Sequence, residues 1–393
     1  MPKLEKSSSG RSPFGDFLAV VLLLAILGGL GWLWWQSKHP KKKSAPKITA
    51  TAKPKPVITS PITVKPTPLV VLPPPAVPVV RSNPVVVVLP VPRTNPPVVV
   101  PVKSAAEFPR PVRDVFEAQV ALADWGISAG SIDGAIGSQT RAALAAFQRL
   151  HGLPVTSALD AATRAVLTLD NPPITTYLIT TNDLLRLQPI GKTWLAKSQQ
   201  SALDYETILE LVAEKFHAHP LQIQKLNPGV NWANVLAGTA LKVPAAAYPE
   251  APERAALVVI HLSDKFLEAF DAETNLLLHC PCSIAARVEK RPVGELHVAV
   301  VAPDPNYTFD PAVFPESAEA QAIGHKIILP PGPNNPVGVA WVGLDKPGYG
   351  IHGTPGPEQV GRTESHGCFR LANWNAAYFI KLAWTGLPVQ VVP

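Results

Sequence analysis

The stretch that decides the fold lies near the C-terminus: residues 349–354 read Tyr-Gly-Ile-His-Gly-Thr and residues 365–370 read Ser-His-Gly-Cys-Phe-Arg. A cysteine attacks as its thiolate, and a nearby histidine is a common base for removing the thiol proton. Cys368 follows His366 by two residues and His352 by sixteen, and glycines flank these groups. Glycine permits close backbone approach, which an oxyanion site made of backbone N–H groups needs. Prolines and glycines between the two parts predict a loop, with one strand ending at His352 and another starting near Cys368.

This stretch resembles the signature of YkuD-type L,D-transpeptidases, in which a His-Gly pair precedes Ser-His-Gly-Cys. Residues 291–296, Arg-Pro-Val-Gly-Glu-Leu, look like the family's Thr-Pro-x-Gly-x-Phe strand except at the first and last positions. Residues 335–344 contain Asn-Pro-Val-Gly and Trp-Val-Gly-Leu, which look like the family's Asn-Pro-Leu-Gly and Trp-x-Gly-Leu. Several motifs in order are more specific than one. The resemblance covers roughly residues 257–392 and implies a mostly β catalytic domain over residues 255–393.

The hydrophobic pattern of this domain agrees with that expectation. Short runs of Val, Leu and Ile between turn residues predict strands, and one amphipathic segment predicts a helix. The predicted strands are residues 256–262, 266–271, 276–283, 296–302, 326–329, 339–344 and 389–392, and the predicted helix is residues 373–385.

The chemistry that the resemblance implies is acyl transfer on a tetrapeptide stem of peptidoglycan. Cys368 attacks the carbonyl of the third stem residue, the terminal D-alanine leaves, and an amine resolves the thioester. His352 is the expected base, with its other ring nitrogen held by the carbonyl of Gly353. His366 remains an alternative base, because residues two apart on an extended strand share a face. Backbone N–H groups of His366, Gly367 and Cys368 are candidates for the oxyanion hole.

Four further residues complete the predicted site as substrate-binding candidates. Arg370 either holds a substrate carboxylate in a fork-like pair or stabilises the loop. Ser365 fits a structural role beside the motif, and Tyr349 and Trp341 either line the cleft or belong to the core. No cofactor and no metal is expected, since the thiol supplies the nucleophile and the Cys and His spacing fits no common zinc pattern.

The charge distribution separates a linker from the folded parts. The chain has 393 residues, 45 prolines and a net charge of +6. Eleven Lys and Arg residues and no Asp or Glu lie between residues 38 and 103, and removing these eleven charges leaves −5 for the rest. Dense prolines predict a disordered, largely polyproline II linker over residues 37–108. The mildly acidic remainder argues against nucleic acid as a partner, and the basic linker favours an extended segment along an anionic surface.

Residues 1–36 are predicted to form a short polar tail and a transmembrane anchor. Residues 17–35 are uncharged and apolar with tryptophans at the end, and about twenty apolar residues span a bilayer. A cleaved signal peptide would have a shorter apolar core and an Ala-x-Ala site close behind it. We therefore expect a single-pass anchor in the inner membrane, with the C-terminal domains in the periplasm or cell-wall space. Lysines flank the span on both sides, so this orientation follows from the wall-directed domains.

Residues 109–170 resemble the three-helix peptidoglycan-binding domain. The family pattern is Gln-x-x-Leu, then Ile-Asp-Gly-x-x-Gly-x-x-Thr, then Ala-Leu-x-x-Phe-Gln. It is matched at residues 119–122, 132–140 and 143–148. The resemblance implies wall binding but assigns no binding residue.

Residues 174–245 resemble a LysM-type glycan-binding module. The resemblance rests on Leu-Gln-Ile-Gln-Lys-Leu-Asn-Pro at residues 221–228 and Leu-Ala-Gly-Thr-Ala-Leu-Lys-Val-Pro at residues 236–244. It implies the order strand, helix, helix, strand, but residues 184–203 form an extra segment. Glycan binding and bracing of the catalytic domain are equal alternatives for this module.

The whole chain is thus predicted to be a multidomain α+β protein, and three functions stay open for it. A transpeptidase would cross-link stem peptides or attach another protein to the wall. An L,D-carboxypeptidase would let water resolve the same thioester, and the motif does not separate the two because they share the first step. A non-catalytic wall-binding scaffold is the third possibility, and the intact thiol between two histidines argues against it.

Overall fold

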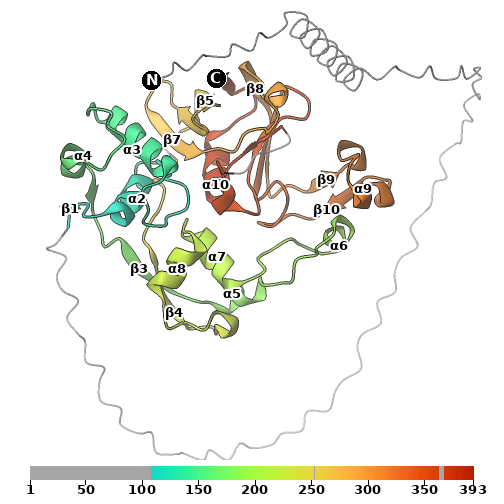
Figure 1. Cartoon of the computed structure of the whole chain (residues 1–393), viewed down its shortest axis with the longest axis horizontal. Helices are drawn as coiled ribbons and strands as arrows, with labels where there is room; N and C mark the ends of the chain where they lie inside the picture. Colours follow the sequence, from blue (N-terminus) through green and yellow to red (C-terminus); the bar gives the residue numbers. More distant parts are fainter. Residues whose placement is uncertain (1–107, 252, 363–366) are drawn as a thin grey trace, which may run out of the picture. The chain divides into compact units, whose positions relative to one another are not determined.

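The computed structural model of the chain describes residues 108–251, 253–362 and 367–393 (Figure 1). By its internal contacts the chain divides into two units, Met1–Thr94 and Asn95–Pro393. All described residues belong to the second unit, which therefore contains every element discussed below.

Some predicted features lie outside the described residues. They are the anchor at residues 17–35, the linker up to residue 107, and the motif residues Ser365 and His366. Within the part of the chain that is described, no helix is long and apolar enough to cross a membrane.

Three helices form the first folded region: α2 (Val115–Ala123), α3 (Ser138–Leu150) and α4 (Ala161–Val166). The side chains of Asp114 and Asp160 accept backbone N–H groups at the starts of α2 and α4, which satisfies donors that have no partner within the helix. Two short strands, β1 (Arg110–Pro111) and β2 (Thr168–Leu169), pair antiparallel and join the two ends of the region.

Gln119 explains why this region carries its sequence motif. The buried side chain accepts the N–H of Gly134 at 2.8 Å and donates to Asp133 and Thr140 at 2.9 and 3.1 Å. These bonds tie the first helix to the turn that precedes the second. The motif residues Asp133, Gly134 and Thr140 therefore have a structural role here.

The next region begins with β3 (Ile174–Leu178) and ends with β4 (Ala240–Pro244), and the two strands pair antiparallel. The expected order of strand, two helices and strand corresponds to β3, α7, α8 and β4. Two short helices precede α7, and the second of them lies within the extra segment. The helices are α5 (Thr181–Leu185), α6 (Trp194–Ser198), α7 (Ile208–Lys215) and α8 (Pro220–Leu226).

The extra segment packs against a small hairpin of the C-terminal region. Leu203 is fully buried in one cluster with Phe309 and Leu329. The ring of Trp194 stacks on Phe309 with 4.5 Å between centroids. The extra segment thus packs against the C-terminal region through apolar side chains.

This hairpin was only partly predicted. It consists of β9 (Tyr307–Phe309) and β10 (Ile327–Leu329), with α9 (Ala318–Ile323) between them. The sequence predicted a strand at residues 326–329 but neither β9 nor α9. β9 reads Tyr-Thr-Phe and lacks the run of Val, Leu and Ile by which the other strands were predicted.

The C-terminal region is built on an eight-stranded sheet in the order β13-β12-β11-β8-β14-β5-β6-β7. Neighbouring strands are antiparallel except for the parallel pairs β12–β13 and β14–β5. The strands are β5 (Leu257–His261), β6 (Phe266–Phe270), β7 (Leu276–Pro281), β8 (Gly294–Pro303), β11 (Ala340–Leu344), β12 (Gly350–His352), β13 (Phe369–Arg370) and β14 (Pro388–Val392). The strands predicted for this sheet are present, with ends within two residues of the expected positions.

Helix α10 (Asn373–Leu382) packs on one face of the sheet, where Phe379 and Leu382 are buried with Val342 and Ile351 of β11 and β12. The helix ends three residues before the predicted boundary because Ala383 already has extended backbone, with ψ of 150°. The apolar core therefore lies on the α10 side of β11 and β12, and residues that alternate with Val342 and Ile351 face the other way.

The two edges of the sheet are linked next to the cysteine motif. Ser283, just after β7, and Arg370 of β13 exchange two backbone hydrogen bonds of 2.9 and 3.0 Å. The short strand β13 is consequently held on both sides, by β12 and by the end of β7.

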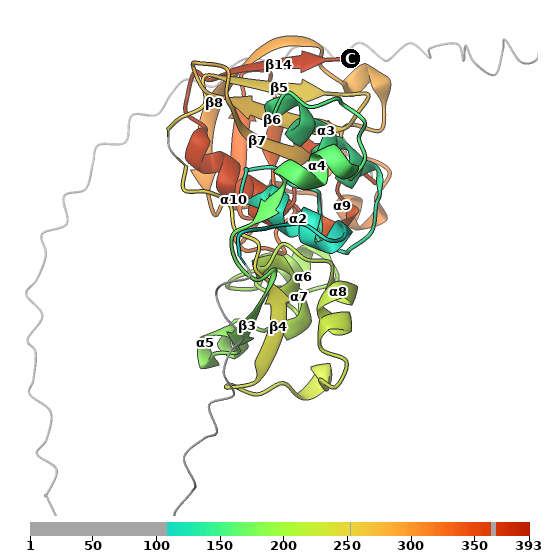
Figure 2. The same cartoon turned by 90° about the vertical axis from the view of Figure 1, so that its left-hand side faces the viewer.

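The three-helix region forms backbone hydrogen bonds with β7, an edge strand of the sheet. Ser128 donates its N–H to the carbonyl of His279 at 2.7 Å, and His279 donates to the carbonyl of Gly126 at 3.0 Å. Figure 2 shows α3 beside β7. These bonds cover backbone groups that an edge strand would otherwise leave unpaired.

Candidate active site

The parallel pairing of β12 and β13 brings the two halves of the cysteine motif together. Ile351 lies opposite Phe369 and His352 opposite Arg370. Cys368 directly precedes β13, and its thiol donates to the carbonyl of Gly348 at 3.6 Å. Paired residues, and residues two apart on one strand, point to the same side of a sheet. His352 and Arg370 therefore share the face opposite the core.

His352 is held as a neutral base. Its Nδ1 lies 2.6 Å from the carbonyl oxygen of Gly353, the contact expected from the sequence. A carbonyl only accepts, so Nδ1 carries the proton and Nε2 keeps its lone pair. Burial lowers the pKa of His352 to about 4; the hydrogen bond to Gly353 opposes this shift and the charge of Arg370 adds to it. The imidazole is thus uncharged at neutral pH and able to take a proton.

Trp341 supports this imidazole from the neighbouring strand. It is the cross-strand partner of His352, and their rings stack with 5.5 Å between centroids and 25° between planes. A Cβ added at Gly350 would come within 2.5 Å of the Trp341 ring, so the indole needs a glycine there. Trp341, expected either in the cleft or in the core, contacts the expected base.

Cys368 needs such a base. Burial raises the pKa of its thiol, although a hydrogen bond from the backbone of Gly350 and the positive charge of Arg370 oppose this. At neutral pH the sulfur is therefore mainly a thiol, and its attack requires removal of the proton. Cys280 and Cys282 are free, fully buried cysteines, and burial raises the pKa of both thiols.

One aromatic side chain near the thiol was missed by sequence reasoning. Burial raises the pKa of Tyr307, the negative charge of the Cys368 thiolate raises it further, and the positive charge of Arg370 lowers it. Tyr307 therefore lies within electrostatic reach of both groups. Its strand β9 gave no periodic signal, so nothing in the sequence pointed to this residue.

The remaining predicted residues lie at the same end of the sheet. A Cβ added at Gly367 would lie 3.8 Å from the ring of Tyr349, and Lys346 places its ammonium 5.2 Å from the centre of that ring. Gly353 follows His352 directly. The structure thus brings together Cys368, His352, Gly353, Gly367, Arg370, Tyr349 and Trp341, whereas Ser365 and His366 lie outside the described residues.

The side chains that could together hold a metal ion lie away from Cys368. Among the described residues, the only group of three or more within reach of one ion is Glu253, Asp271 and Glu273, two of them exposed. None belongs to the site around Cys368, and exposed acidic groups of this kind are common on protein surfaces.

Comparison with known proteins agrees with this geometry. Residues 112–167 match the family described as "Putative peptidoglycan binding domain", and residues 255–391 match "L,D-transpeptidase catalytic domain". The "Putative L,D-transpeptidase YkuD" of Bacillus licheniformis is 26% identical over 186 residues, which cover 47% of this chain and 93% of that protein. The "Putative L,D-transpeptidase YqjB" of Bacillus subtilis is 32% identical over 105 residues, covering 25% of this chain and 51% of that protein.

Among solved structures, L,D-transpeptidase 3 from Mycobacterium tuberculosis aligns with 41% of this chain and 77% of that chain, at 17% identity and a TM-score of 0.27. The sequence matches support a peptidoglycan L,D-transpeptidase. Residues 255–391 form an L,D-transpeptidase catalytic domain of the YkuD type, preceded by a peptidoglycan-binding domain.

Proposed function

We propose that this chain is a peptidoglycan L,D-transpeptidase whose nucleophile is Cys368 and whose base is His352. One observation carries the assignment of the base. His352 is buried, donates Nδ1–H to Gly353 and lies on the strand paired with that of the cysteine, so its free Nε2 serves a thiol of raised pKa.

The reaction then proceeds in two steps. His352 takes the thiol proton, the sulfur forms a bond to the carbonyl carbon of the third stem residue, and the bond from that carbon to the nitrogen of the terminal D-alanine breaks. The imidazolium gives its proton to the departing amine. In the second step the nitrogen of an acceptor amine bonds to the thioester carbon, and the bond from that carbon to sulfur breaks. His352 takes the proton of the amine and gives it to the sulfur, which restores the thiol of Cys368.

The other site residues take roles around this centre. Backbone N–H groups of Gly367 and Cys368 are the proposed donors to the developing oxyanion, where loss of one donor typically costs about 100–1,000-fold in rate. Arg370 binds a carboxylate of the donor stem and Tyr349 contacts the substrate, while Trp341 keeps the imidazole in place. His366 is the alternative base, and Ser365 keeps the structural role expected from the sequence.

The rest of the chain delivers the enzyme to its substrate. Residues 17–35 anchor it in the membrane, residues 37–108 are the tether, and residues 109–170 bind the wall. Residues 174–245 are a LysM-like module that braces the catalytic domain, supported by the contacts of its extra segment with the β9–β10 hairpin.

The test is intact-mass spectrometry of the full-length chain with a tetrapeptide muropeptide and, separately, with a carbapenem that traps the thioester. We expect one adduct on Cys368 and a cross-linked muropeptide product. Cys368→Ala should abolish both, and Cys282→Ala, which removes a fully buried thiol, should keep both. An adduct that persists in Cys368→Ala, or a wild-type chain that forms none, would overturn the proposal.

A further inference from the structure

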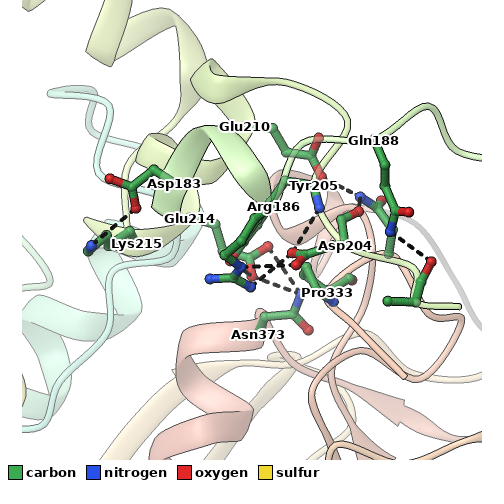
Figure 3. Close-up of polar contacts among 12 residues, drawn as sticks. Asp183, Arg186, Gln188, Asp204, Tyr205, Glu210, Glu214, Lys215, Pro333 and Asn373 are labelled. Carbon is green, nitrogen blue, oxygen red and sulfur yellow. Dashed lines mark hydrogen bonds and ion pairs between the residues drawn. The ribbon is translucent and has the colours of Figure 1, made fainter. Parts of the chain in front are cut away.

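A buried carboxylate of the LysM-like module reaches into the catalytic domain. Glu214 of α7 is 8% exposed, and its two oxygens each accept from the side-chain amide of Asn373 at 3.1 Å. The hydroxyl of Tyr205 donates to the same carboxylate at 3.1 Å. Figure 3 shows Glu214 and Asn373 facing each other across the boundary between the two regions.

Asn373, the first residue of α10, has its amide orientation fixed by all its neighbours. Its nitrogen donates to Glu214 and to the carbonyl of Pro333 at 3.1 Å. Its oxygen accepts the N–H of Thr354 at 3.0 Å and that of Val339 at 3.4 Å. A flipped amide would place donor against donor and acceptor against acceptor, so only this orientation satisfies the buried groups.

The amide oxygen of Asn373 packs directly on the turn that holds His352. A Cβ added at Gly353 would lie 2.2 Å from this oxygen, so the His-Gly pair needs its glycine for this approach. The N–H of the next residue, Thr354, is bound to the same oxygen, and the carbonyl of Gly353 accepts Nδ1–H of His352 at 2.6 Å. The contacts run without a gap from Glu214 to the imidazole.

We propose that Glu214 is a positioning residue for acyl transfer: it fixes the amide of Asn373, which holds the turn at Gly353 and thereby the tautomer and rotation of His352. The inference rests on the proposed function, since its readout is acylation of Cys368. It makes the module part of the catalytic machinery as well as a brace of the catalytic domain.

The competing explanation is that the module is only a rigid support. Asn334 offers the matched control, because it crosses the same boundary without touching Asn373. Its side chain donates to the carbonyl of Asp204 at 2.9 Å and to the carboxylate of Glu210, one helical turn before Glu214. Asn334→Ala should weaken the support and leave the Glu214 contact intact.

Ionisation of Glu214 gives a signature that a mere support lacks. Burial raises the pKa of Glu214 to about 7, and hydrogen bonds from Asn373 and Tyr205 oppose this. The negative charge of Glu210 raises this pKa and the positive charge of Arg186 lowers it. Other titratable groups lining the clefts beside Glu214 are Lys215, His217, Lys381 and Glu358.

Only the anionic form of Glu214 accepts at both oxygens, so positioning should weaken as the pH falls through about 7. The pKa of His352, about 4, is too low to produce a step in that range.

The experiment measures the rate of Cys368 acylation by a carbapenem from pH 5.5 to 8.5, by intact mass, on the full-length chain. Wild-type protein should lose about tenfold in rate between pH 8 and pH 6, as a group of pKa 7 becomes protonated. At pH 8, Glu214→Gln should react at least about tenfold more slowly than wild type, which is the loss expected for a hydrogen bond to a charged group. Its rate should show no step near pH 7. Asn334→Ala should keep the wild-type rate and the wild-type step.

Tyr205→Phe keeps the carboxylate but removes a donor that stabilises its charge, so the step should move to higher pH. This shift decides the matter even if Glu214→Gln does not fold. The inference is overturned if Glu214→Gln keeps the wild-type pH profile or if Asn334→Ala loses as much rate as Glu214→Gln. It is also overturned if the rate of Tyr205→Phe changes at the same pH as the rate of wild type. A wild-type chain that forms no adduct at any pH would instead overturn the proposed function.

Discussion

The two accessory regions attach to the catalytic domain in different ways. The three-helix region pairs backbone groups with edge strand β7 and adds an ion pair of 2.7 Å between Arg149 and Glu268. It also touches the loop that leads toward the cysteine, where Gln139 donates to the carbonyl of Val360 at 2.6 Å. The module at residues 174–245 instead inserts a buried carboxylate behind the turn of the expected base.

The difference shows when an accessory region can influence acylation of Cys368. It can do so when its contacts with the catalytic domain end at residues that hold the site. Edge pairing protects β7, which is separated from β11 by four strands in the sheet order and reaches β13 through the two backbone bonds between Ser283 and Arg370. The contact of Glu214 ends at Asn373, whose oxygen binds the residue after Gly353. Changes in the module should therefore alter the rate of acylation, and changes at β7 should alter mainly stability.

The largest effect is expected from Asn373→Ala. The change leaves the N–H groups of Thr354 and Val339 without their acceptor, and it leaves the carboxylate of Glu214 with Tyr205 as its remaining donor. Each such group costs about 1–3 kcal/mol, so the free energy of unfolding should fall by about 3 kcal/mol or more. The rate of acylation should fall about 100-fold, because the turn at Gly353 loses its anchor. Chemical denaturation and intact-mass kinetics measure the two effects.

Asn375→Ala is the matched control on the same helix. Asn375 is fully buried and accepts from the hydroxyl of Tyr248, away from the His352 turn. It should lose stability and keep its acylation rate. Equal loss of rate in both variants would show that α10 acts only through its general packing, and the comparison between the two regions would fail.

A second prediction concerns stability and pH. The pKa of Glu214 is about 7 in the folded protein against an ordinary value of 4.5, so between these values the folded state binds the extra proton. Stability contributed by this group therefore falls as pH rises from about 4.5 to 7, by on the order of 3 kcal/mol. Glu214→Gln should remove this dependence and be relatively more stable at pH 8 than at pH 5.

The quantity to measure is the difference in unfolding free energy between wild type and Glu214→Gln at each pH. Burial raises the pKa of Asp124 to about 6 and lowers that of His217 to about 4, so the wild-type curve alone mixes several groups. A variant that is slower in acylation yet more stable at high pH would identify Glu214 as a functional residue. A variant that loses the same stability at every pH would identify a structural brace.

Much of the architecture was accessible from the sequence because its signals are local. Alternation of Val, Leu and Ile marked the strands of the main sheet, and the adjacency of His352 and Cys368 followed from a strand, loop and strand pattern. The roles of the predicted site residues remain predictions. Tyr307 and β9 stayed hidden because Tyr-Thr-Phe has no run of Val, Leu and Ile, and α9 stayed hidden because Ala-Glu-Ala-Gln-Ala-Ile has a single large apolar residue.

Glu214 was hidden for a different reason. On an amphipathic helix a glutamate reads as a solvent-facing residue, and its partner Asn373 lies 159 residues further along the chain. Burial of such a side chain is decided by the surface that docks on the helix. No property of residues 208–215 reveals that surface, so the contact could be found only in the structure.

The smallest effect is expected from Arg149→Ala in the three-helix region. The Arg149 side chain is 47% exposed, and an ion pair so accessible to solvent contributes about 1 kcal/mol or less. Burial raises the pKa of Glu268, but the hydrogen bonds of His261 and His279 and the charge of Arg149 together lower it below its ordinary value. His279 lies 3.0 Å from this carboxylate and is not changed in the variant. Acylation of Cys368 should stay within about twofold of wild type at every pH, while the unfolding free energy drops slightly. A loss of rate as large as that of Glu214→Gln would mean that edge docking at β7 also controls the catalytic strands, and the contrast between the two regions would disappear.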